Sequence, residues 1–373
     1  MKPVVKEIFL LRFIACLGIV LLHGVTLALD MYDIVENPLL VVLTSIQLAL
    51  MFGTPLFIFI SEFVIAYSYP NQLPKKFYVK RFKYIFIPFL FIGVLDAALH
   101  SIGTNSGEFE KKVILNLFEG NFHGYFIIII FQFYFLHPLF VKYIVPKYPA
   151  YQVIITAFAI NFGYLAFFNF LDPYEYFYYL PYVELEWSVL NKMPFPAWIA
   201  YFVTAYYCGR NYEIFLSLLH RFRYQLFVVF LFTLSGLLAI QVLGLITEIH
   251  SKRIDVVLYT LSVAFLLFFI ASKIQRMPSF IIFISRYSFG IYLLHPLFNI
   301  MVKNFLVNYE EKLSIFFVVF LSFFVSTICA IYVTSILNKW KFGAYLVGQV
   351  HLHEKQSANN VTHSVIGHDT TVE

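Results

Sequence analysis

Long runs of apolar residues recur along almost the whole chain. A helix needs about 20 apolar residues to cross a lipid bilayer, and ten runs approach or exceed this length. Among them, the sixth is short and the second is long enough to tilt. The pattern therefore predicts an all-α integral membrane protein with about ten transmembrane helices in one bundle. The approximate limits of these helices are 8–29, 39–67, 83–99, 122–141, 151–170, 196–209, 224–246, 254–272, 280–301 and 313–337.

The composition indicates a chain that is solvated largely by lipid. Apolar residues make up 61% of the 373 residues and charged residues only 13%, whereas soluble domains carry about 25% charged residues. So few charges cannot coat a water-facing surface. Soluble, secreted globular, disordered and nucleic-acid-binding proteins are therefore excluded, and the lipid bilayer is the first expected partner.

The lysines and arginines predict the orientation of the bundle, because positive residues concentrate in cytoplasmic loops. With the N-terminus inside, 17 of the 26 lie on the cytoplasmic side, 7 lie outside, and Arg12 and Arg286 lie within helices. Both termini are therefore predicted to face the cytoplasm, with the bundle in a cell membrane. The cytoplasmic set is Lys2, Lys6, Lys75, Lys76, Lys80, Arg81, Lys83, Lys142, Lys147, Arg210, Arg221, Arg223, Lys273, Arg276, Lys339, Lys341 and Lys355, and the outer set is Lys111, Lys112, Lys192, Lys252, Arg253, Lys303 and Lys312.

The chain is predicted to consist of one membrane domain, residues 1–338, and a polar tail, residues 339–373. The tail has the composition of a disordered cytoplasmic segment, and its histidines are too irregularly spaced to predict a metal site. The three cysteines, Cys16, Cys208 and Cys329, lie in apolar runs. They are interpreted as buried hydrophobic residues, not as disulfide partners or metal ligands.

Polar residues within the apolar runs are the candidates for chemistry. A charged side chain inside a membrane helix costs about 2.5–3.5 kcal/mol unless it finds a partner or water. The orientation of the helices places these residues in two layers. The inner layer is cationic and has Glu62 as a candidate partner, and the outer layer combines histidines with one carboxylate. The inner layer contains Arg12, Arg81, Lys83 and Arg286, the outer layer contains His23, Asp96, His295 and His123, and His137 lies near the inner end of its helix.

The first helix joins the two layers. Arg12 and His23 are eleven residues apart, which is close to three helical turns, so they share a face about 16 Å apart. A cationic inner mouth suits a phosphate-bearing ligand, and histidine beside a carboxylate suits proton transfer. The alternative is a set of structural pairs scattered around the bundle.

The segment 171–196 combines aromatic residues with carboxylates. Tyr176, Tyr179 and Trp187 stand among Glu and Asp residues, a composition that suits the apolar faces and hydroxyl groups of a sugar. An aromatic belt at the membrane interface explains the same residues equally well. Both interpretations stay open at this point.

Three motifs resemble those of the bacterial membrane acyltransferase family called acyltransferase-3. Arg12 followed by His23 resembles the opening Arg-x10-His motif, the run Ser285–Pro296 resembles the late-helix signature, and Tyr78–Phe89 is similar to the entry of the third helix. The resemblance covers roughly residues 8–337 and includes the layout of ten helices with both ends inside. The runs Phe52–Pro55 and Gly120–Ile127 are most similar to the branch found in intercellular adhesin (poly-N-acetylglucosamine) operons.

The resemblance implies transfer of an acyl group, acetyl or succinyl, from cytoplasmic acyl-CoA to a hydroxyl of an extracytoplasmic polysaccharide. Acyl-CoA is then a donor substrate, no cofactor is permanently bound, and polysaccharide synthase subunits are candidate partners. The implied roles are catalysis by His23 with its motif partner Arg12, orientation of His23 by Asp96 or His295, donor binding by Arg81, Lys83 and Arg286, and glycan binding by His123, Tyr176, Tyr179 and Trp187.

The sequence departs from the family pattern at two positions. Tyr84 stands where the third-helix motif has its second arginine, with Lys83 as a candidate replacement, and Glu62 stands where many members have glycine. Two alternatives to an acyltransferase stay open. One is an exporter of a poly-N-acetylglucosamine-type polysaccharide, and the other is a proton-coupled transporter that uses His23 and Asp96.

Overall fold

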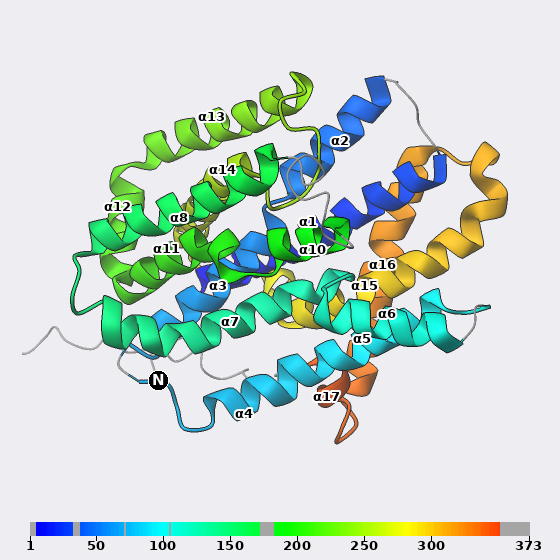
Figure 1. Cartoon of the computed structure of the whole chain (residues 1–373), viewed down its shortest axis with the longest axis horizontal. Helices are drawn as coiled ribbons and strands as arrows, with labels where there is room; N and C mark the ends of the chain where they lie inside the picture. Colours follow the sequence, from blue (N-terminus) through cyan, green and yellow to red (C-terminus); the bar gives the residue numbers. More distant parts are fainter. Residues whose placement is uncertain (1–4, 33–37, 71, 104–105, 172–182, 351–373) are drawn as a thin grey trace, which may run out of the picture.

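The computed structural model describes residues 5–32, 38–70, 72–103, 106–171 and 183–350, and every regular element in these ranges is helical. Nine continuous helical stretches within them are long and apolar enough to cross a membrane. The predicted all-α membrane bundle is thereby confirmed (Figure 1). The nine stretches are Glu7–Tyr32, Pro38–Ser68, Phe77–His100, Gly107–Ile144, Ala150–Phe170, Arg223–Val242, Ile254–Lys273, Ser279–Tyr309 and Ile315–Leu337.

Several of these stretches contain more than one helical element, because the backbone changes its winding within them. The α-helices are α1 Glu7–Tyr32, α2 Pro38–Leu50, α3 Gly53–Ser68, α4 Phe77–Arg81, α5 Ile87–His100, α6 Ser106–Phe118, α7 Phe126–Leu139, α8 Ala150–Phe170, α10 Val183–Lys192, α11 Ile199–Arg210, α12 Tyr212–Arg221, α13 Arg223–Val242, α14 Ile254–Lys273, α15 Ser279–Leu306, α16 Ile315–Leu337 and α17 Ala344–Val347. The π-helical turns are Phe82–Phe86 and Phe140–Ile144, and the 3-10 turns are His123–Tyr125, Phe195–Trp198 and Val307–Lys312.

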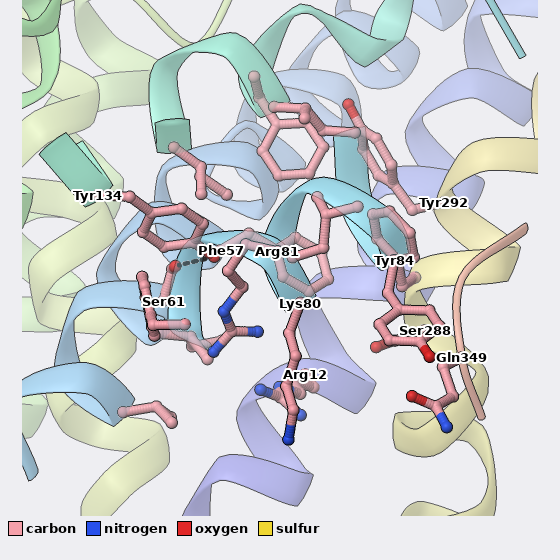
Figure 2. A pocket seen from close by; sticks show the side chains of 18 of the residues that line it. Arg12, Phe57, Ser61, Lys80, Arg81, Tyr84, Tyr134, Ser288, Tyr292 and Gln349 are labelled. Atoms are coloured by element: carbon pink, nitrogen blue, oxygen red, sulfur yellow. Dashed lines mark hydrogen bonds between the residues drawn. The ribbon is translucent and has the colours of Figure 1, made fainter. Parts of the chain in front are cut away.

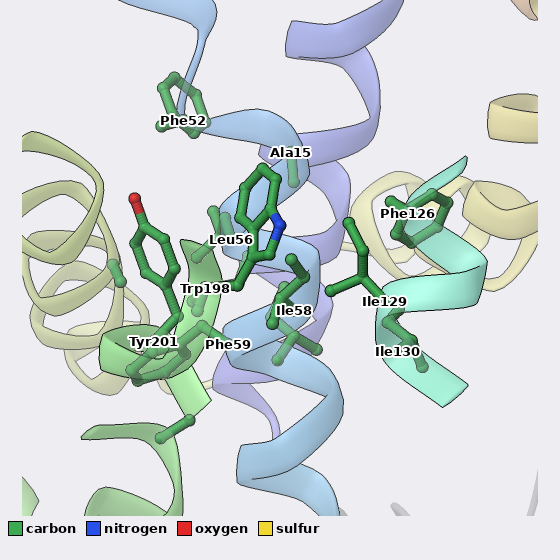
Figure 3. Packing of buried hydrophobic residues seen from close by; sticks show 14 of the residues in the cluster. Ala15, Phe52, Leu56, Ile58, Phe59, Phe126, Ile129, Ile130, Trp198 and Tyr201 are labelled. Carbon is green, nitrogen blue, oxygen red and sulfur yellow. The ribbon is translucent and has the colours of Figure 1, made fainter. Parts of the chain in front are cut away.

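The predicted sixth helix, 196–209, is present but shorter than a membrane span. It consists of the 3-10 turn Phe195–Trp198 and the twelve-residue α11. Trp198, Tyr201 and Phe202 are each at most 1% exposed, and Figure 3 shows Trp198 among Ala15, Leu56 and Ile58. Because neighbouring helices bury this segment, it does not have to match the thickness of the lipid by itself.

Helix α6 lies between the predicted spans 83–99 and 122–141, in a segment for which no membrane helix was predicted. Its apolar residues are interrupted by charged ones, so no continuous apolar run marks it. It packs against α5, where the Asn116 side-chain amide donates to the backbone oxygen of Gly93 at 3.0 Å and to Asp96 Oδ2 at 2.9 Å. α6 therefore covers one face of α5 and determines the partners of Asp96.

Residues 339–350 fold onto the bundle and do not form part of a disordered tail. α17 packs against α5, and the Tyr345 ring stacks on Tyr84 with 5.5 Å between ring centroids. Asn338 fixes the end of the segment, because its side chain donates to the Gly348 oxygen and accepts from the Val350 nitrogen. The rest of the predicted tail, 351–373, lies outside the described residues.

Close packing of α11 against α3 depends on a glycine. A Cβ atom on Gly209 would lie 2.5 Å from the backbone oxygen of Phe63 and 3.2 Å from the Ala66 side chain. The obstacle is backbone, so a side chain cannot move aside to relieve the contact. Small residues at such crossings let membrane helices approach one another.

We expect Gly209→Ala to lower the stability of the protein by about 1–3 kcal/mol, the usual effect of overpacking. Thermal unfolding in detergent measures the change. Gly163→Ala is the matched control, because a Cβ there meets no atom within 4 Å. Equal unfolding temperatures for the two variants would show that the α3–α11 contact does not depend on Gly209.

Candidate active site

Two cavities lie in the bundle and share one residue in their walls. The larger, about 930 Å³, is lined by residues of α1, α3, α4, α7 and α15 and by the π-helical turn Phe82–Phe86. The smaller, about 320 Å³, is lined by residues of α1 and α2 and by the loop Ile249–Lys252. We call them the cationic cavity and the histidine cavity. Tyr292 lines both.

Among the described residues, the wall of the cationic cavity has six basic side chains and no carboxylate. None of them takes part in an ion pair within the described part of the chain. Arg12 and Arg81 lie close enough to repel each other. Such a wall attracts a ligand with several negative charges. The six residues are Arg12, Lys75, Lys76, Lys80, Arg81 and Arg286.

The entry of the third span positions the basic side chains. Arg81 ends α4, and its guanidinium lies 5.2 Å from the ring centre of Phe77 and 5.5 Å from that of Tyr134. The Tyr134 hydroxyl in turn accepts a hydrogen bond from Ser61 at 3.2 Å. Figure 2 shows Arg12, Lys80 and Arg81 directed into the same part of the cavity. π-Helical turns such as the one that follows Arg81 are frequent at functional sites.

The structure does not place Lys83 in the wall of this cavity. Lys83 is exposed in the π-helical turn Phe82–Phe86, whereas Lys80, Arg81 and Tyr84 line the cavity. Lys80 therefore supplies a second positive charge from α4.

Glu62 does not neutralise the arginines of the inner layer, although the sequence made it a candidate partner. Its Oε1 lies 2.7 Å from His137 Nδ1, and both side chains are at most 5% exposed. Neither residue lines the cationic cavity. α3 and α7 therefore hold a buried carboxylate–imidazole pair beside the site, and the positive charge of the cavity stays uncompensated.

Three histidines from distant parts of the chain meet at the histidine cavity. The ring centroids of His23 and His295 are 5.1 Å apart, and those of His123 and His295 are 5.5 Å apart. His23 and His123 line the cavity, and His295 lies behind them, fully buried. The predicted grouping of these histidines is thus present in the structure. Among the described residues, no group of His, Cys, Asp or Glu is arranged to hold a metal ion.

Backbone hydrogen bonds fix two of these rings. His295 Nδ1 donates to the Ile291 oxygen at 3.0 Å, and His123 Nε2 donates to the Leu293 oxygen at 3.2 Å. A neutral imidazole that donates through one nitrogen accepts through the other. His295 Nε2 is buried and has no partner within the described residues. The cluster therefore contains nitrogens that can accept a proton.

Asp96 is not positioned to orient His23. Its Oδ2 accepts from Asn116 at 2.9 Å and lies 3.5 Å from His100 Nδ1. Asp96 does not line the histidine cavity. The cause is α6, which covers the face of α5 that carries this carboxylate. Of the two predicted partners of His23, His295 is the one in contact.

Tyr292 separates the two cavities. Its ring lies 4.4 Å from Phe126 and 6.2 Å from Phe57, which line the cationic cavity, and 5.5 Å from His123 on the other side. Its hydroxyl donates to the backbone oxygen of His123. One aromatic side chain, only 3% exposed, therefore divides a basic compartment from a histidine compartment.

The predicted aromatic sugar surface is only partly described. Tyr176 and Tyr179 lie outside the described residues. Trp187 on α10 packs against the end of α8, with its ring 5.4 Å from Phe167 and 4.6 Å from Phe168, and it does not line either cavity. This contact fits the interpretation of Trp187 as part of an aromatic belt.

Several residues of the cavity walls were not predicted as site residues, among them Tyr292, Lys252 and Gln349. Tyr292 lies three residues before His295, and this spacing of about one helical turn was the available signal. Lys252 was counted only as an outer positive charge, yet it lines the histidine cavity. Gln349 lines the cationic cavity from the C-terminal segment, and no local pattern marks it.

Comparisons with known proteins agree with this geometry. The family model described as an acyltransferase domain matches residues 5–336. A provisionally named membrane-bound acyltransferase of Bacillus subtilis (strain 168) is 39% identical over 353 residues, which cover 93% of this chain and 95% of the relative. No solved structure matches the chain with significance.

Two other similar proteins are provisionally named poly-beta-1,6-N-acetyl-D-glucosamine export proteins. The one from Staphylococcus aureus (strain MSSA476) is 27% identical over 354 residues, which cover 94% of this chain and 97% of the relative. The one from Staphylococcus epidermidis is 30% identical over 302 residues, which cover 80% of this chain and 82% of the relative.

We expect His137→Ala to destabilise the protein by about 3–5 kcal/mol, because it leaves the Glu62 carboxylate buried without its partner. The double replacement Glu62→Leu with His137→Phe removes both polar groups and should recover most of this loss. Thermal unfolding in detergent measures both effects. Binding of coenzyme A to the double variant should equal that of the wild type. Weaker binding at unchanged stability would place the pair in the ligand site.

Proposed function

The chain belongs to the acyltransferase-3 family of multi-pass bacterial membrane proteins, and from this membership and the two cavities we propose that it is an O-acyltransferase. The donor is a cytoplasmic acyl-CoA, with acetyl and succinyl as the candidate acyl groups. The acceptor is a hydroxyl of an extracytoplasmic surface polysaccharide. The observation that carries the proposal is the joint wall at Tyr292, where a polyanion site and a proton-accepting site meet.

The cationic cavity suits the donor. Coenzyme A carries phosphate groups, and arginine binds phosphate with paired, charge-assisted hydrogen bonds. Arg12, Arg81 and Arg286 supply such donors without competing carboxylates in the wall. The distribution of lysine and arginine favours a cytoplasmic position for this end of the bundle. The donor then enters from the side on which acyl-CoA is made.

The histidine cavity suits the transfer itself. His23 accepts the proton of the attacking hydroxyl while the sugar oxygen forms a bond to the thioester carbon. The carbon–sulfur bond then breaks, and the proton passes to the coenzyme A thiolate as it leaves. His295, whose ring lies 5.1 Å from that of His23, restricts the position of the His23 ring. General base catalysis of this kind contributes about 10²–10⁴-fold to a rate.

An exporter is the second candidate, because the staphylococcal relatives carry that name. A polysaccharide that crosses the bundle needs a continuous path. Tyr292 lies between the two cavities, and its hydroxyl is bonded to the backbone of His123. Both functions require passage beside Tyr292, but a sugar chain needs a wider opening than the linear thioester arm of acyl-CoA, which supports acyl transfer over export.

We expect His23→Ala to abolish acylation of the surface polysaccharide and to leave its export unchanged. Mass analysis of polysaccharide from a deletion strain, complemented with wild type or His23→Ala, measures this. The deletion strain should show the same loss of acyl groups, and the mass difference identifies the group. A polymer that stays inside the deletion strain, but is exported and normally acylated with His23→Ala, would support the exporter instead.

We expect Arg81→Met to weaken coenzyme A binding about tenfold or more, because a charge-assisted hydrogen bond contributes about 1.5–3 kcal/mol. The matched control is Lys83→Met, which removes an exposed charge two residues away that does not line the cavity. Equilibrium binding of coenzyme A to protein in lipid nanodiscs measures both. Equal losses in the two variants would mean that binding responds to overall charge and not to the cavity.

A further inference from the structure

Lys252 is a positive charge in the histidine cavity that acyl transfer as described above does not use. The wall of this cavity contains Lys252 and the histidines His23, His123 and His250, and none of its described residues is a carboxylate. Within the described part of the chain, the Lys252 ammonium has no hydrogen-bonded or ion-paired partner. An unpaired ammonium in a partly buried wall raises the free energy of the folded protein. A bound anion would lower it.

The two carboxylates nearest to Lys252 in sequence, Asp255 and Glu248, are already engaged with Arg253 and His250. Glu248 Oε2 lies 2.9 Å from His250 Nε2, and the Glu248 side chain is mostly exposed. Burial and the nearby Lys192 lower the pKa of Lys252 to about 8, and Glu248 opposes the shift. Burial also lowers the pKa of Lys192, and Glu119 opposes that shift. A lysine whose charge is disfavoured by burial and by a second lysine is stabilised by a bound anion.

The loop that carries Lys252 is held rigidly. Arg253 is fully buried, and its guanidinium binds Asp255 through two hydrogen bonds of 3.0 and 2.6 Å. The same guanidinium donates to the backbone oxygens of Ile246 and Glu248 at 3.0 and 3.2 Å. A buried ion pair therefore holds this loop in place in the cavity wall.

The backbone at Lys252 is fixed from a second helix. The Asn169 side chain on α8 donates to the Lys252 oxygen at 3.2 Å and accepts from the Ile254 nitrogen at 2.9 Å. A flexible surface lysine would not have its main chain held on both sides in this way. Preorganisation of this kind is typical of a binding group.

We propose that Lys252 forms an anion site in the histidine cavity, which binds a carboxylate of the substrate during acyl transfer. This inference rests on the proposed function for the identity of the substrate, but not for the existence of the site. The carboxylate has two candidate sources. It belongs either to the acyl group, as in succinyl-CoA, or to an acidic sugar of the acceptor. The polar groups of Thr26, Gln47 and Ser251 in the same wall suit sugar hydroxyls.

Four probes distinguish the two sources. Acetyl-CoA and succinyl-CoA differ only in the acyl end, so their shared carrier makes the same contacts in the cationic cavity. A hyaluronan tetrasaccharide carries glucuronate, and a chitin tetrasaccharide of equal length is neutral. Equilibrium binding of each probe is measured with the full chain in lipid nanodiscs, for wild type, Lys252→Met and Lys252→Arg. Lys111→Met is the control, because it removes an exposed lysine outside both cavity walls.

We expect Lys252→Met to weaken the binding of one carboxylate-bearing probe, succinyl-CoA or the hyaluronan tetrasaccharide, about tenfold or more, the effect of losing a charge-assisted hydrogen bond. The matching probe without that carboxylate should bind as before, and Lys252→Arg should restore most of the loss. Loss of succinyl-CoA binding assigns the site to the acyl group, and loss of hyaluronan binding assigns it to the acceptor. Unchanged binding of both anions by Lys252→Met would overturn the proposal.

The pH dependence gives a second readout. A lysine with a pKa near 8 loses its charge as the pH rises through that value, so wild-type affinity for the anionic probe should fall between about pH 7 and pH 9. Lys252→Arg should remove this fall, because arginine stays charged. The other ionisable groups in the cavity wall or in electrostatic contact with Lys252 are His23, His123, His250, Tyr125, Tyr292, Lys192 and Glu248, and they are the same in both proteins.

Two controls separate this proposal from the proposed function. Unchanged binding of free coenzyme A and an unchanged unfolding temperature show that each variant is folded. Binding does not require turnover, so a protein that transfers no acyl group still reports on the anion site. If Lys252→Met still transfers acyl groups and binds both anions as the wild type does, the anion site is contradicted and the proposed acyltransferase function is not.

Discussion

The architecture depends on one constraint, which is the high free energy of an unpaired charge in an apolar bundle. The chain meets it in two ways. Glu62 pairs with His137 inside the bundle, and Arg253 pairs with Asp255 next to the loop Ile249–Lys252. Within the described residues, Arg12 and Arg81 have no such partner and instead face a cavity of about 930 Å³. The unpaired charges thus mark the space that a ligand is expected to fill.

Local properties of the chain were sufficient to predict the helices. Apolar length determines whether a segment can cross the bilayer, so nine of the ten predicted spans correspond to stretches long enough to do so. The remaining predicted span, 196–209, is shorter than a membrane crossing and is buried by neighbouring helices. α6 was missed for the opposite reason, since its charged residues interrupt the apolar run while Asn116 anchors it to α5.

The candidate site was predictable only as far as spacing along one helix allows. Arg12 and His23 were placed on one face by their separation, and His295 was recognised from its motif. The partners of Glu62 and Asp96 depend on which helix packs beside each carboxylate, which is a tertiary property. The same limit explains Lys83, because its direction depends on the winding of the helix at the π-helical turn Phe82–Phe86. Gln349 reaches the cavity through a fold of the C-terminal segment that no periodicity marks.

The C-terminal segment has a consequence for how the protein is made. Gln349 belongs to the wall of the cationic cavity, and residues 339–350 reach that wall only after α16 has been synthesised. The wall of the cavity therefore lacks Gln349 until the end of this segment has been synthesised. A nonsense mutation directly after α16 would keep every membrane helix and still produce a protein with an incomplete wall. Genetic screens that score only membrane insertion would class such a truncated allele as intact.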